Sequence, residues 1–328
     1  MHRHPIDRRR LLQLGAGSAA ALATPWLRAQ AWPSKPIRLV VPFAPGGSSE
    51  IIARAAAAEM GKLLDQSVFV DNKPGGAGNI AMTEVARADD QHTLILGHIG
   101  TLAVNPYIFE KLSFDVNKDF KPVSLLAKVP SLYLVNPEVP AKNLVEFIAL
   151  AKKKPGQLNY GSAGNGSAGH LAMEYLKMAS GTFMTHVPYR GTGPMLTDLI
   201  AGRLDAASIG AAAVIQFIRA GKLRCIATGT AQRIAQLPDV PTVAEQGFPG
   251  FEMTQWYGLN APASLPPAAI DKLAAAAAKA VKEPATQERL ANDAAIAVGS
   301  TAAEYAQFIG AEQKRWQPVI ARAKIKPD

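Results

Sequence analysis

Two glycine-bearing segments carry the chemistry that this sequence suggests most directly, the binding of an anion. The first, residues 42–49, reads Pro-Phe-Ala-Pro-Gly-Gly-Ser-Ser and joins an apolar run to an alanine-rich stretch that we expect to be a helix. Gly46 and Gly47 lack a Cβ atom, so the backbone can turn sharply there and come close to a ligand. The free amides and the dipole of the following helix favour a negative charge. The alternative is a plain strand–helix turn without a ligand.

The second segment, residues 161–170, reads Gly-Ser-Ala-Gly-Asn-Gly-Ser-Ala-Gly-His and also joins an expected strand to an expected helix. Its hydroxyl groups and backbone amides could hold a carboxylate. His170 lies one turn into the helix, where it either supports the loop by a hydrogen bond or contacts the ligand. The residues alone leave both roles open.

Three further glycine loops follow expected strands, at residues 75–79, 97–101 and 189–193. In open parallel sheets, ligands bind beyond the carboxyl ends of the strands. Several such loops therefore predict a cleft lined by backbone donors. Arg190 is the charged residue that could clamp a carboxylate, and a surface arginine at a helix start is its alternative.

The segment Gly164–Gly169 also fits G-x-G-x-x-G after a strand and before a helix, which is the context of a dinucleotide-binding loop. Such a loop needs an acidic residue about 20 positions further on to reach the ribose. Residues 185–190 contain no Asp or Glu, although Arg190 would suit a 2′-phosphate. An exported NADP-linked oxidoreductase therefore stays open as the alternative function.

The sequence offers little other chemistry. It contains no G-x-S-x-G, H-E-x-x-H or P-loop pattern, and its histidines form no pair at metal-ligand spacing, so we expect neither an enzyme nor a metal or cofactor site. Cys225 is the one cysteine, so the chain cannot form an internal disulfide. It lies in an expected strand, as a buried apolar residue or, alternatively, as a reactive thiol.

Residues 1–31 read as an export signal. A basic start precedes a mildly apolar stretch, and the small-x-small site Ala29-Gln30-Ala31 predicts a mature chain that begins at Trp32. Residues 8–13 resemble a twin-arginine signal, with an ordinary secretory signal as the alternative. No cysteine follows the apolar stretch, so we expect no lipid anchor. The predicted location is the periplasm, as a soluble protein.

The net charge changes with export. The full chain carries +9, and the signal holds five Arg and one Asp, so the part from Trp32 onwards carries +5. A modest positive charge suits anionic solutes. The longest basic run, residues 152–154, ends an expected helix, where cations stabilise the helix dipole. Because basic residues are otherwise scattered, we expect no nucleic-acid partner.

Strand-like and helix-like segments alternate in two series, which predicts an α/β fold with two parallel, doubly wound sheets. The C-terminal third is mainly helical and needs a sheet to cover, so we expect it to pack on the first series. The prediction is a two-lobed, periplasmic-binding-protein-like fold. Lobe 1 comprises residues 32–130 plus 240–328, and lobe 2 comprises residues 131–239. Two chain crossings would form a hinge that allows closure around a ligand.

At these loops the sequence resembles the solute-binding receptors of tripartite tricarboxylate transporters, also called Bug-type receptors. The matching motifs run along the whole chain after residue 31: Trp32-Pro33-Ser34-Lys35-Pro36, Val40-Val41-Pro42-Phe43-Ala44-Pro45-Gly46-Gly47, Asn72-Lys73-Pro74-Gly75-Gly76-Ala77-Gly78, Ser162-Ala163-Gly164 with His170, Val187-Pro188-Tyr189-Arg190-Gly191, and Leu237-Pro238-Asp239-Val240-Pro241-Thr242.

The resemblance implies a flytrap fold without catalysis. It also implies that a ligand carboxylate is held by the first glycine loop, largely through backbone groups, while the Ser-Ala-Gly motif completes the cleft from the other lobe. By motif position it points to these ligand-binding residues: Phe43, Ala44, Gly47, Ser48, Asn79, Thr101, Ser162, Gly164, Ser167 and His170, with Tyr189 and Arg190 as weaker candidates.

Two departures from the family pattern bear on the ligand. Glu50 stands where relatives often have Asp, and Ser208-Ile209-Gly210 stands where many carry an acidic piece that would suit an amino group. The second departure argues against an amino-acid ligand.

We therefore expect a monomeric periplasmic receptor that captures a small carboxylate-bearing solute, a di- or tricarboxylate or an aromatic acid. Its partner would be the membrane subunits of a transporter, with a sensor as the alternative.

Overall fold

The computed structural model describes residues 32–327, so the predicted signal at residues 1–31 lies outside the described residues. Among the described residues, those from 35 to 327 cluster as one compact unit. Its strands pair into a ten-stranded sheet with two parallel-stranded halves. Within the described part of the chain, no helix is both long and apolar enough to cross a membrane.

The first half contains three parallel strands with β1 in the middle, and the antiparallel β9 extends it. In order, the strands are β2 (Val68–Asn72), β1 (Ile37–Val41), β3 (Thr93–His98), β9 (Thr254–Pro262) and the first part of β4 (Phe120–Val135). All of β3, the last three residues of β1 and the last eight residues of β9 are buried, as expected for strands covered on both faces.

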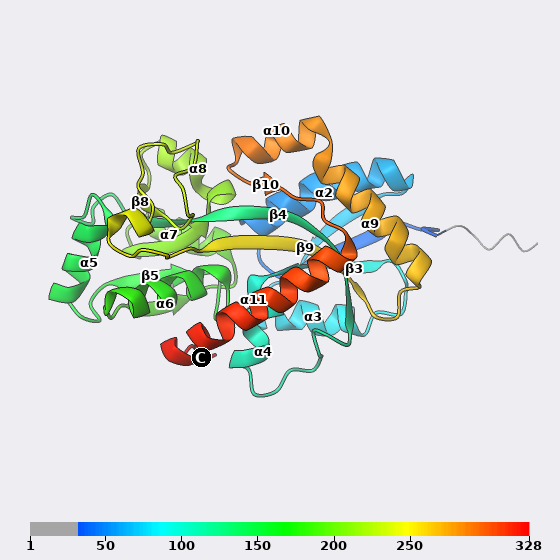
Figure 1. Cartoon of the computed structure of the whole chain (residues 1–328), viewed down its shortest axis with the longest axis horizontal. Coiled ribbons are helices and arrows are strands. Elements are labelled where there is room, and N and C mark those ends of the chain that lie inside the picture. Colours follow the sequence, from blue (N-terminus) through cyan, green and yellow to red (C-terminus); the bar gives the residue numbers. More distant parts are fainter. Residues whose placement is uncertain (1–31, 328) are drawn as a thin grey trace, which may run out of the picture. The chain divides into compact units, whose positions relative to one another are not determined.

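The long strand β4 joins the two halves (Figure 1). Residues Phe120 to Pro130 pair with β9, whereas Ser131 to Val135 pair with β7 and β8. The second half contains β7 (Ala206–Gly210), β5 (Asn159–Ser162), β6 (Thr185–Pro188) and β8 (Arg224–Thr228), and the two-residue β10 (Ile296–Ala297) pairs with β4 in the first half. β5 runs parallel to β6 and β7.

Helices follow the strands in both halves (Figure 1). The helical segments are α2 (Ser48–Leu64), η1 (Gly76–Gly78), α3 (Asn79–Ala86), η2 (Gly100–Val104), α4 (Asn105–Ile108), α5 (Leu144–Lys153), α6 (Ala168–Ser180), α7 (Thr192–Ile200), α8 (Ala211–Arg219), η3 (Ala244–Gln246), α9 (Pro267–Lys282), α10 (Pro284–Asn292) and α11 (Ala302–Ala323). The alternation of parallel strands and helices confirms the predicted α/β class.

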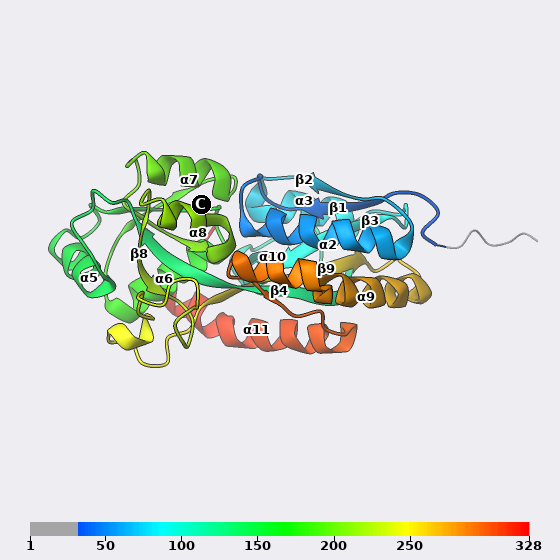
Figure 2. The same cartoon turned by 90° about the horizontal axis from the view of Figure 1, so that it is seen from above.

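The C-terminal helices pack mainly on the first half (Figure 2). α9 lies against α2 and β4, and α11 lies against β4, with contacts to α6 in the second half. Thr301 and Glu304 start α11 with a capping box, in which each side chain bonds the other residue's backbone amide. On α11, Glu312 accepts hydrogen bonds from the indoles of Trp256 at 2.8 Å and Trp316 at 3.0 Å. The hydrogen bond from Trp256 to Glu312 therefore ties β9 to α11.

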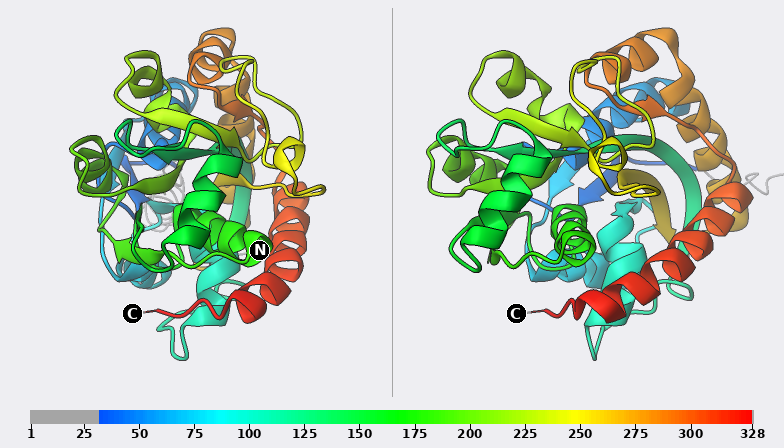
Figure 3. Two further views of the ribbon diagram at one scale, coloured as in Figure 1. Left: turned by 90° about the vertical axis from the view of Figure 1, so that its left-hand side faces the viewer. Right: turned by 60° about the vertical axis from the view of Figure 1, so that its left-hand side comes forward.

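The chain passes between the halves at Pro130–Ser131 in β4 and again after the segment that follows β8 (Figure 3). That segment stays beside β8, since the amide of Val243 donates to Thr228 O at 2.9 Å and Gln246 donates to Ile226 O at 2.9 Å. Met253 then donates to Gly229 before β9 begins. The predicted lobe boundaries stay a prediction.

Candidate ligand-binding site

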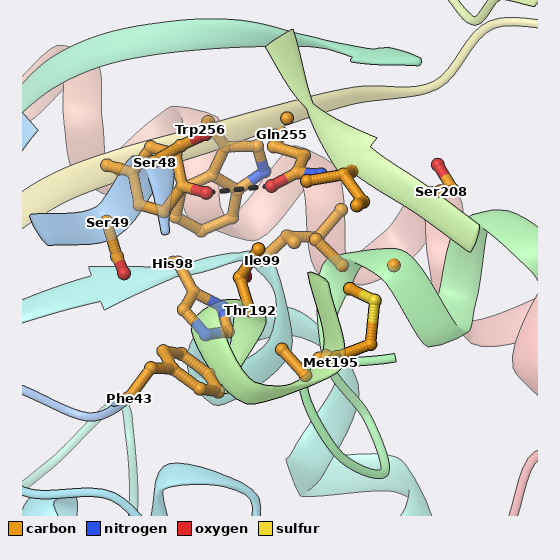
Figure 4. A pocket seen from close by; sticks show the side chains of 17 residues that line it. Phe43, Ser48, Ser49, His98, Ile99, Thr192, Met195, Ser208, Gln255 and Trp256 are labelled. Atoms are coloured by element: carbon orange, nitrogen blue, oxygen red, sulfur yellow. Dashed lines mark hydrogen bonds between the residues drawn. The ribbon is translucent and has the colours of Figure 1, made fainter. Parts of the chain in front are cut away.

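A cavity of about 30 Å³ lies between the two halves of the sheet, among the side chains drawn in Figure 4. We call the lining from the first half the first wall and the lining from the second half the second wall. The first wall comprises Phe43, Ser48, Ser49, His98, Ile99, Gln255, Trp256 and Tyr257. The second wall comprises Ala163, Ser167, Ala168, Gly169, Thr192, Met195, Ser208, Ile209 and Gly210.

Four helices begin at this cavity, which gives it a surplus of backbone donors. α2, α6, α7 and α8 each follow the carboxyl end of a parallel strand, and the first residue of α2, α6 and α7 and the residue preceding α8 line the cavity. The first amides of a helix have no partner within it, and the helix dipole places positive charge there. The arrangement therefore favours an acceptor-rich, negatively charged group, as the glycine loops predicted.

Ser48 and Ser208 place buried hydroxyls in the lining. Ser48, 3 % exposed in the first wall, contacts the Tyr257 hydroxyl, whereas Ser208, 2 % exposed in the second wall, has no hydrogen-bond partner among the described residues. An unbonded buried hydroxyl costs about 1–3 kcal/mol, so such groups usually serve a ligand or a water molecule. The lining contains no Asp, Glu, Lys or Arg. The cavity can thus hold an anion only through dipoles and hydrogen bonds.

His98 enters the first wall at the end of β3. Its Nδ1 accepts a hydrogen bond from the amide of Gly100 at 2.6 Å, and its ring stacks on Phe43 with centroids 4.5 Å apart. Burial lowers the pKa of His98 to about 3, so the ring is neutral at ordinary pH. Because Nδ1 is the acceptor, the proton sits on Nε2.

Strand β9 supplies the rest of the first wall. The Tyr257 hydroxyl donates to Gln255 Oε1 at 2.7 Å, which leaves the amide NH₂ of Gln255 as its remaining donor group. Burial raises the pKa of Tyr257, so its hydroxyl keeps its proton. Trp256 is held by Glu312 on α11. The strand therefore presents donors and apolar surface to the cavity.

The first predicted loop lies at the cavity. Phe43 and Ser48 line it, and Glu50 closes the loop by accepting a hydrogen bond from the amide of Gly46 at 2.8 Å. Ala44 and Gly47 lie where the loop meets the second half. The amide of Ala44 donates to Arg190 O at 3.2 Å.

In the second predicted loop, most side chains form hydrogen bonds within the loop or with its neighbour His186. Ser162 bonds the amide of Gly164 at 3.0 Å and lies 2.7 Å from Nε2 of His186. Nδ1 of His170 accepts from the amide of Gly166 at 3.1 Å, and none of these side chains is in the lining. Ser167 does line the cavity and caps α6 by accepting from the amide of His170. The geometry fits the supporting role for His170.

The remaining predicted residues lie outside the lining. Thr101 exchanges hydrogen bonds of 3.3 Å with the backbone of His98, and Asn79 accepts from Asn105 at 2.8 Å. Tyr189 donates to Asp198 at 2.7 Å, and Arg190 has an exposed side chain. Thr101 therefore supports a lining residue, whereas the other three contribute no lining side chain.

Several lining residues did not enter the predicted set: His98, Ser208, Thr192, Met195 and the β9 residues Gln255 to Tyr257. The local sequence could have indicated three of these residues. His98 stands in a glycine loop after a strand, Ser208 stands at a strand end, and Thr192 opens an expected helix. Nothing in the local sequence indicates that β9, far along the chain, reaches the same cavity.

Other chemistry is not supported in the described part of the chain. No group of three or more His, Cys, Asp or Glu residues could hold a metal ion among residues 32–327. Cys225 is buried, and burial raises the pKa of its thiol to about 12, which keeps it protonated and argues against a reactive thiolate.

The sequence model described as the tripartite tricarboxylate transporter family receptor matches residues 52–325. This chain belongs to that receptor family. The Bug-type resemblance read from the loops is thereby confirmed. The receptor is 33 % identical to protein BugT of Bordetella pertussis over 313 residues, which cover 94 % of this chain and 96 % of the relative.

Two similar solved structures carry small acids in their names. Rpa4515 of R. palustris with adipate is 34 % identical, with a TM-score of 0.87, covering 90 % of this chain and 100 % of that one. MatC of Rhodopseudomonas palustris with bound malate is 35 % identical, with a TM-score of 0.85, covering 88 % and 100 %. Family and neighbours are receptors rather than enzymes, so the oxidoreductase alternative was wrong.

Proposed function

We propose that this receptor captures a small carboxylate-bearing solute in the periplasm and delivers it to the membrane subunits of a tripartite transporter. The observation that carries the proposal is an uncharged cavity where four helices begin, lined by the hydroxyl of Ser48 and the unbonded hydroxyl of Ser208. Donors surround the cavity on both walls, and no acidic side chain lines it. A carboxylate is the complement of such a lining.

The same lining argues against an amino-acid solute. An ammonium group needs acceptors or a negative charge, and no acidic residue lines the cavity. The carbonyl oxygen of Gln255 already accepts from Tyr257. Acids without an amino group, such as the adipate and malate named with the similar structures, fit better.

We propose that the solute enters when the two walls part. The cavity, at about 30 Å³, has room for ordered water but not for a diacid. Even a small diacid is several times larger. The walls touch through the loops 44–47 and 190–193, where a methyl group placed on Gly193 would collide with the carbonyl oxygen of Pro45. A solute that bridges both walls would stabilise this closed arrangement over an open one.

The closing units we propose are the predicted lobes, 32–130 plus 240–328 and 131–239. Of the twelve predicted ligand-binding residues, we propose direct contact for Phe43, Ser48 and Ser167. Gly47 allows the walls to approach, and Thr101, Ser162, Gly164 and His170 hold the loops in shape.

A thermal-shift screen over carboxylic acids tests the proposal. We expect at least one acid in a panel with adipate, malate, citrate and benzoate to stabilise the purified receptor. At a hundredfold excess over its Kd, a ligand adds about 2.7 kcal/mol to the free energy of unfolding. Titration calorimetry then gives the stoichiometry, expected to be one per chain.

The controls are the matching amides and diamines, which keep the carbon skeleton but lose the negative charge. They should not stabilise the receptor. Tight binding of aspartate, glutamate or a diamine, or no response to any acid, would contradict the proposal. Export and partner need their own test: the N-terminus of the receptor from the periplasm should be Trp32, and uptake of the selected acid should require the membrane subunits. Uptake that persists without those subunits would favour a sensor as the partner.

A further inference from the structure

His98 is buried in the first wall and held in one tautomer by the backbone. Its side chain lines the cavity while His98 as a whole is only 3 % exposed. Nδ1 accepts from Gly100 at 2.6 Å and faces Thr101 N at 3.4 Å. A neutral imidazole that accepts at Nδ1 must carry its proton on Nε2.

Nothing in the described residues uses that proton. The hydrogen bonds of His98 there involve Nδ1 and the main chain. The ring is also fixed in position, because Phe43 stacks on it and Tyr257 meets it edge-on with centroids 6.3 Å apart. A rigid donor in the lining of the cavity is available to an acceptor that the cavity encloses.

The turn after β3 requires a glycine at position 100. A methyl group on Gly100 would collide with the His98 ring and with the carbonyl oxygen of Gly166 in the second half. The turn therefore lies where the walls meet, and the imidazole comes close to any group enclosed between them. Figure 4 shows His98 among the lining side chains, beside Phe43.

We propose that His98 is a specificity-determining residue of this receptor, which donates a hydrogen bond from Nε2 to a carboxylate oxygen of the solute. The inference rests on the proposed capture of a carboxylate. As a neutral donor, His98 adds affinity for an acceptor without adding a positive charge. It would favour an acid over the corresponding amide, since a hydrogen bond to a charged acceptor is about twice as strong as one to a neutral acceptor.

Two substitutions test the roles of the Nδ1 and Nε2 atoms of His98 separately. In His98→Asn, the side-chain oxygen can still accept from the Gly100 amide, but no donor remains at the Nε2 position. In His98→Gln, the longer amide can place an NH₂ near the Nε2 position. His92→Asn is the matched control, because His92 is a buried histidine just before β3, at the opposite end of the strand, and outside the cavity lining.

The probe is the acid that gives the largest shift in the carboxylate screen, with adipate and malate in the panel. By calorimetry, we expect His98→Asn to lose about 10- to 100-fold in affinity, the range for a charge-assisted hydrogen bond. We also expect it to lose preference for the acid over its amide. His98→Gln should retain more affinity than His98→Asn, and His92→Asn should match the wild type.

NMR of the wild type with ¹⁵N-labelled histidine gives a readout that a purely structural role would not move. Without the acid, His98 should be the Nε2–H tautomer; on adding it, the Nε2 resonance should shift while the ring stays neutral between pH 5 and pH 8, about the range in which free histidine titrates.

An Nδ1–H tautomer, an imidazolium in the complex, or wild-type affinity and selectivity in His98→Asn would overturn the role of His98. In those cases the acid still binds the wild type, so the proposed function stands. If no acid shifts the wild type, both proposals fail together. If His98→Asn does not fold, the NMR outcome on the wild type decides.

Discussion

Each wall of the cavity belongs to a half that uses a histidine to hold a glycine amide, yet the two histidines end up differently. Nδ1 of His98 accepts from Gly100, and its ring lines the cavity. Nδ1 of His170 accepts from Gly166, but its ring stacks on His186 at 4.1 Å between centroids and lies outside the lining.

This difference shows that the two walls contribute different kinds of groups to the cavity. The first wall presents side chains: a serine, an imidazole and the polar end of β9. The second wall presents mainly the backbone at the starts of α6, α7 and α8, while its loop side chains bond one another. We therefore expect side-chain substitutions to reduce affinity more in the first wall, and backbone-blocking substitutions to matter where the walls meet.

The largest effect should come from Gly47→Val. A Cβ atom on Gly47 would lie 3.0 Å from Thr192 Oγ1, so a branched side chain has no room between the walls. We expect the affinity for the selected acid to fall by about 100-fold or more, measured by calorimetry. The fold should persist, because the φ of −103° at Gly47 is open to any residue. Unchanged affinity would remove the first loop from the site.

Gly193→Ala tests the contact between the walls without altering any side chain in the cavity. The added methyl group would collide with the Pro45 carbonyl oxygen only when the walls meet. We expect about a 10-fold loss of affinity, with folding stability equal or higher because alanine favours helix. Gly310→Ala on α11 is the control, since its methyl group would meet nothing within 4 Å. Equal affinities of the two variants would argue against closure.

Acid should destabilise the receptor through His98. Burial lowers its pKa from 6.5 to about 3, so the unfolded chain takes up the proton first as the pH falls. Keeping the ring neutral contributes fully to the free energy of unfolding above pH 6.5. Between pH 6.5 and about pH 3 this contribution falls by about 1.4 kcal/mol per pH unit. No acidic or basic side chain in the lining offsets this.

Urea unfolding of wild type and His98→Asn at pH 7 and pH 5 measures that contribution as the difference between the two pH dependences. Parallel pH dependences would show that His98 titrates normally in the folded chain.

The smallest effect should come from Ser208→Ala in the second wall. One hydrogen bond to the solute is lost, so we expect about a 5-fold weaker affinity by calorimetry. Stability without solute should not fall, because the hydroxyl has no partner among the described residues. Arg190→Ala is the comparison: its exposed side chain lies outside the lining, and less than a twofold change is expected. A larger loss of affinity in Arg190→Ala than in Ser208→Ala would support Arg190 as the residue that binds the carboxylate.

Local pattern was enough for much of the fold. The alternation of strands and helices, the helix after the first glycine loop and the mainly helical C-terminal third could be predicted from apolar runs and glycines, which act over a few residues. Strand β4 shows the limit. Its last residues, from Tyr133, read as a strand, whereas the preceding part contains Lys121, Pro122, Lys128 and Pro130 and reads as irregular. Pairing with β9 makes the whole stretch a strand.

The sequence by itself determined where backbone amides could be bared: glycines and small residues at the carboxyl ends of strands, each before a helix. Glycine freedom and helix dipoles are local properties, so they can be read from a few neighbouring residues. Only the tertiary structure decided which side chains face the cavity. His98, Ser208 and Gln255 come together from segments more than 45 residues apart, and a hydroxyl or imidazole becomes an unpartnered donor only through the burial that such distant contacts create.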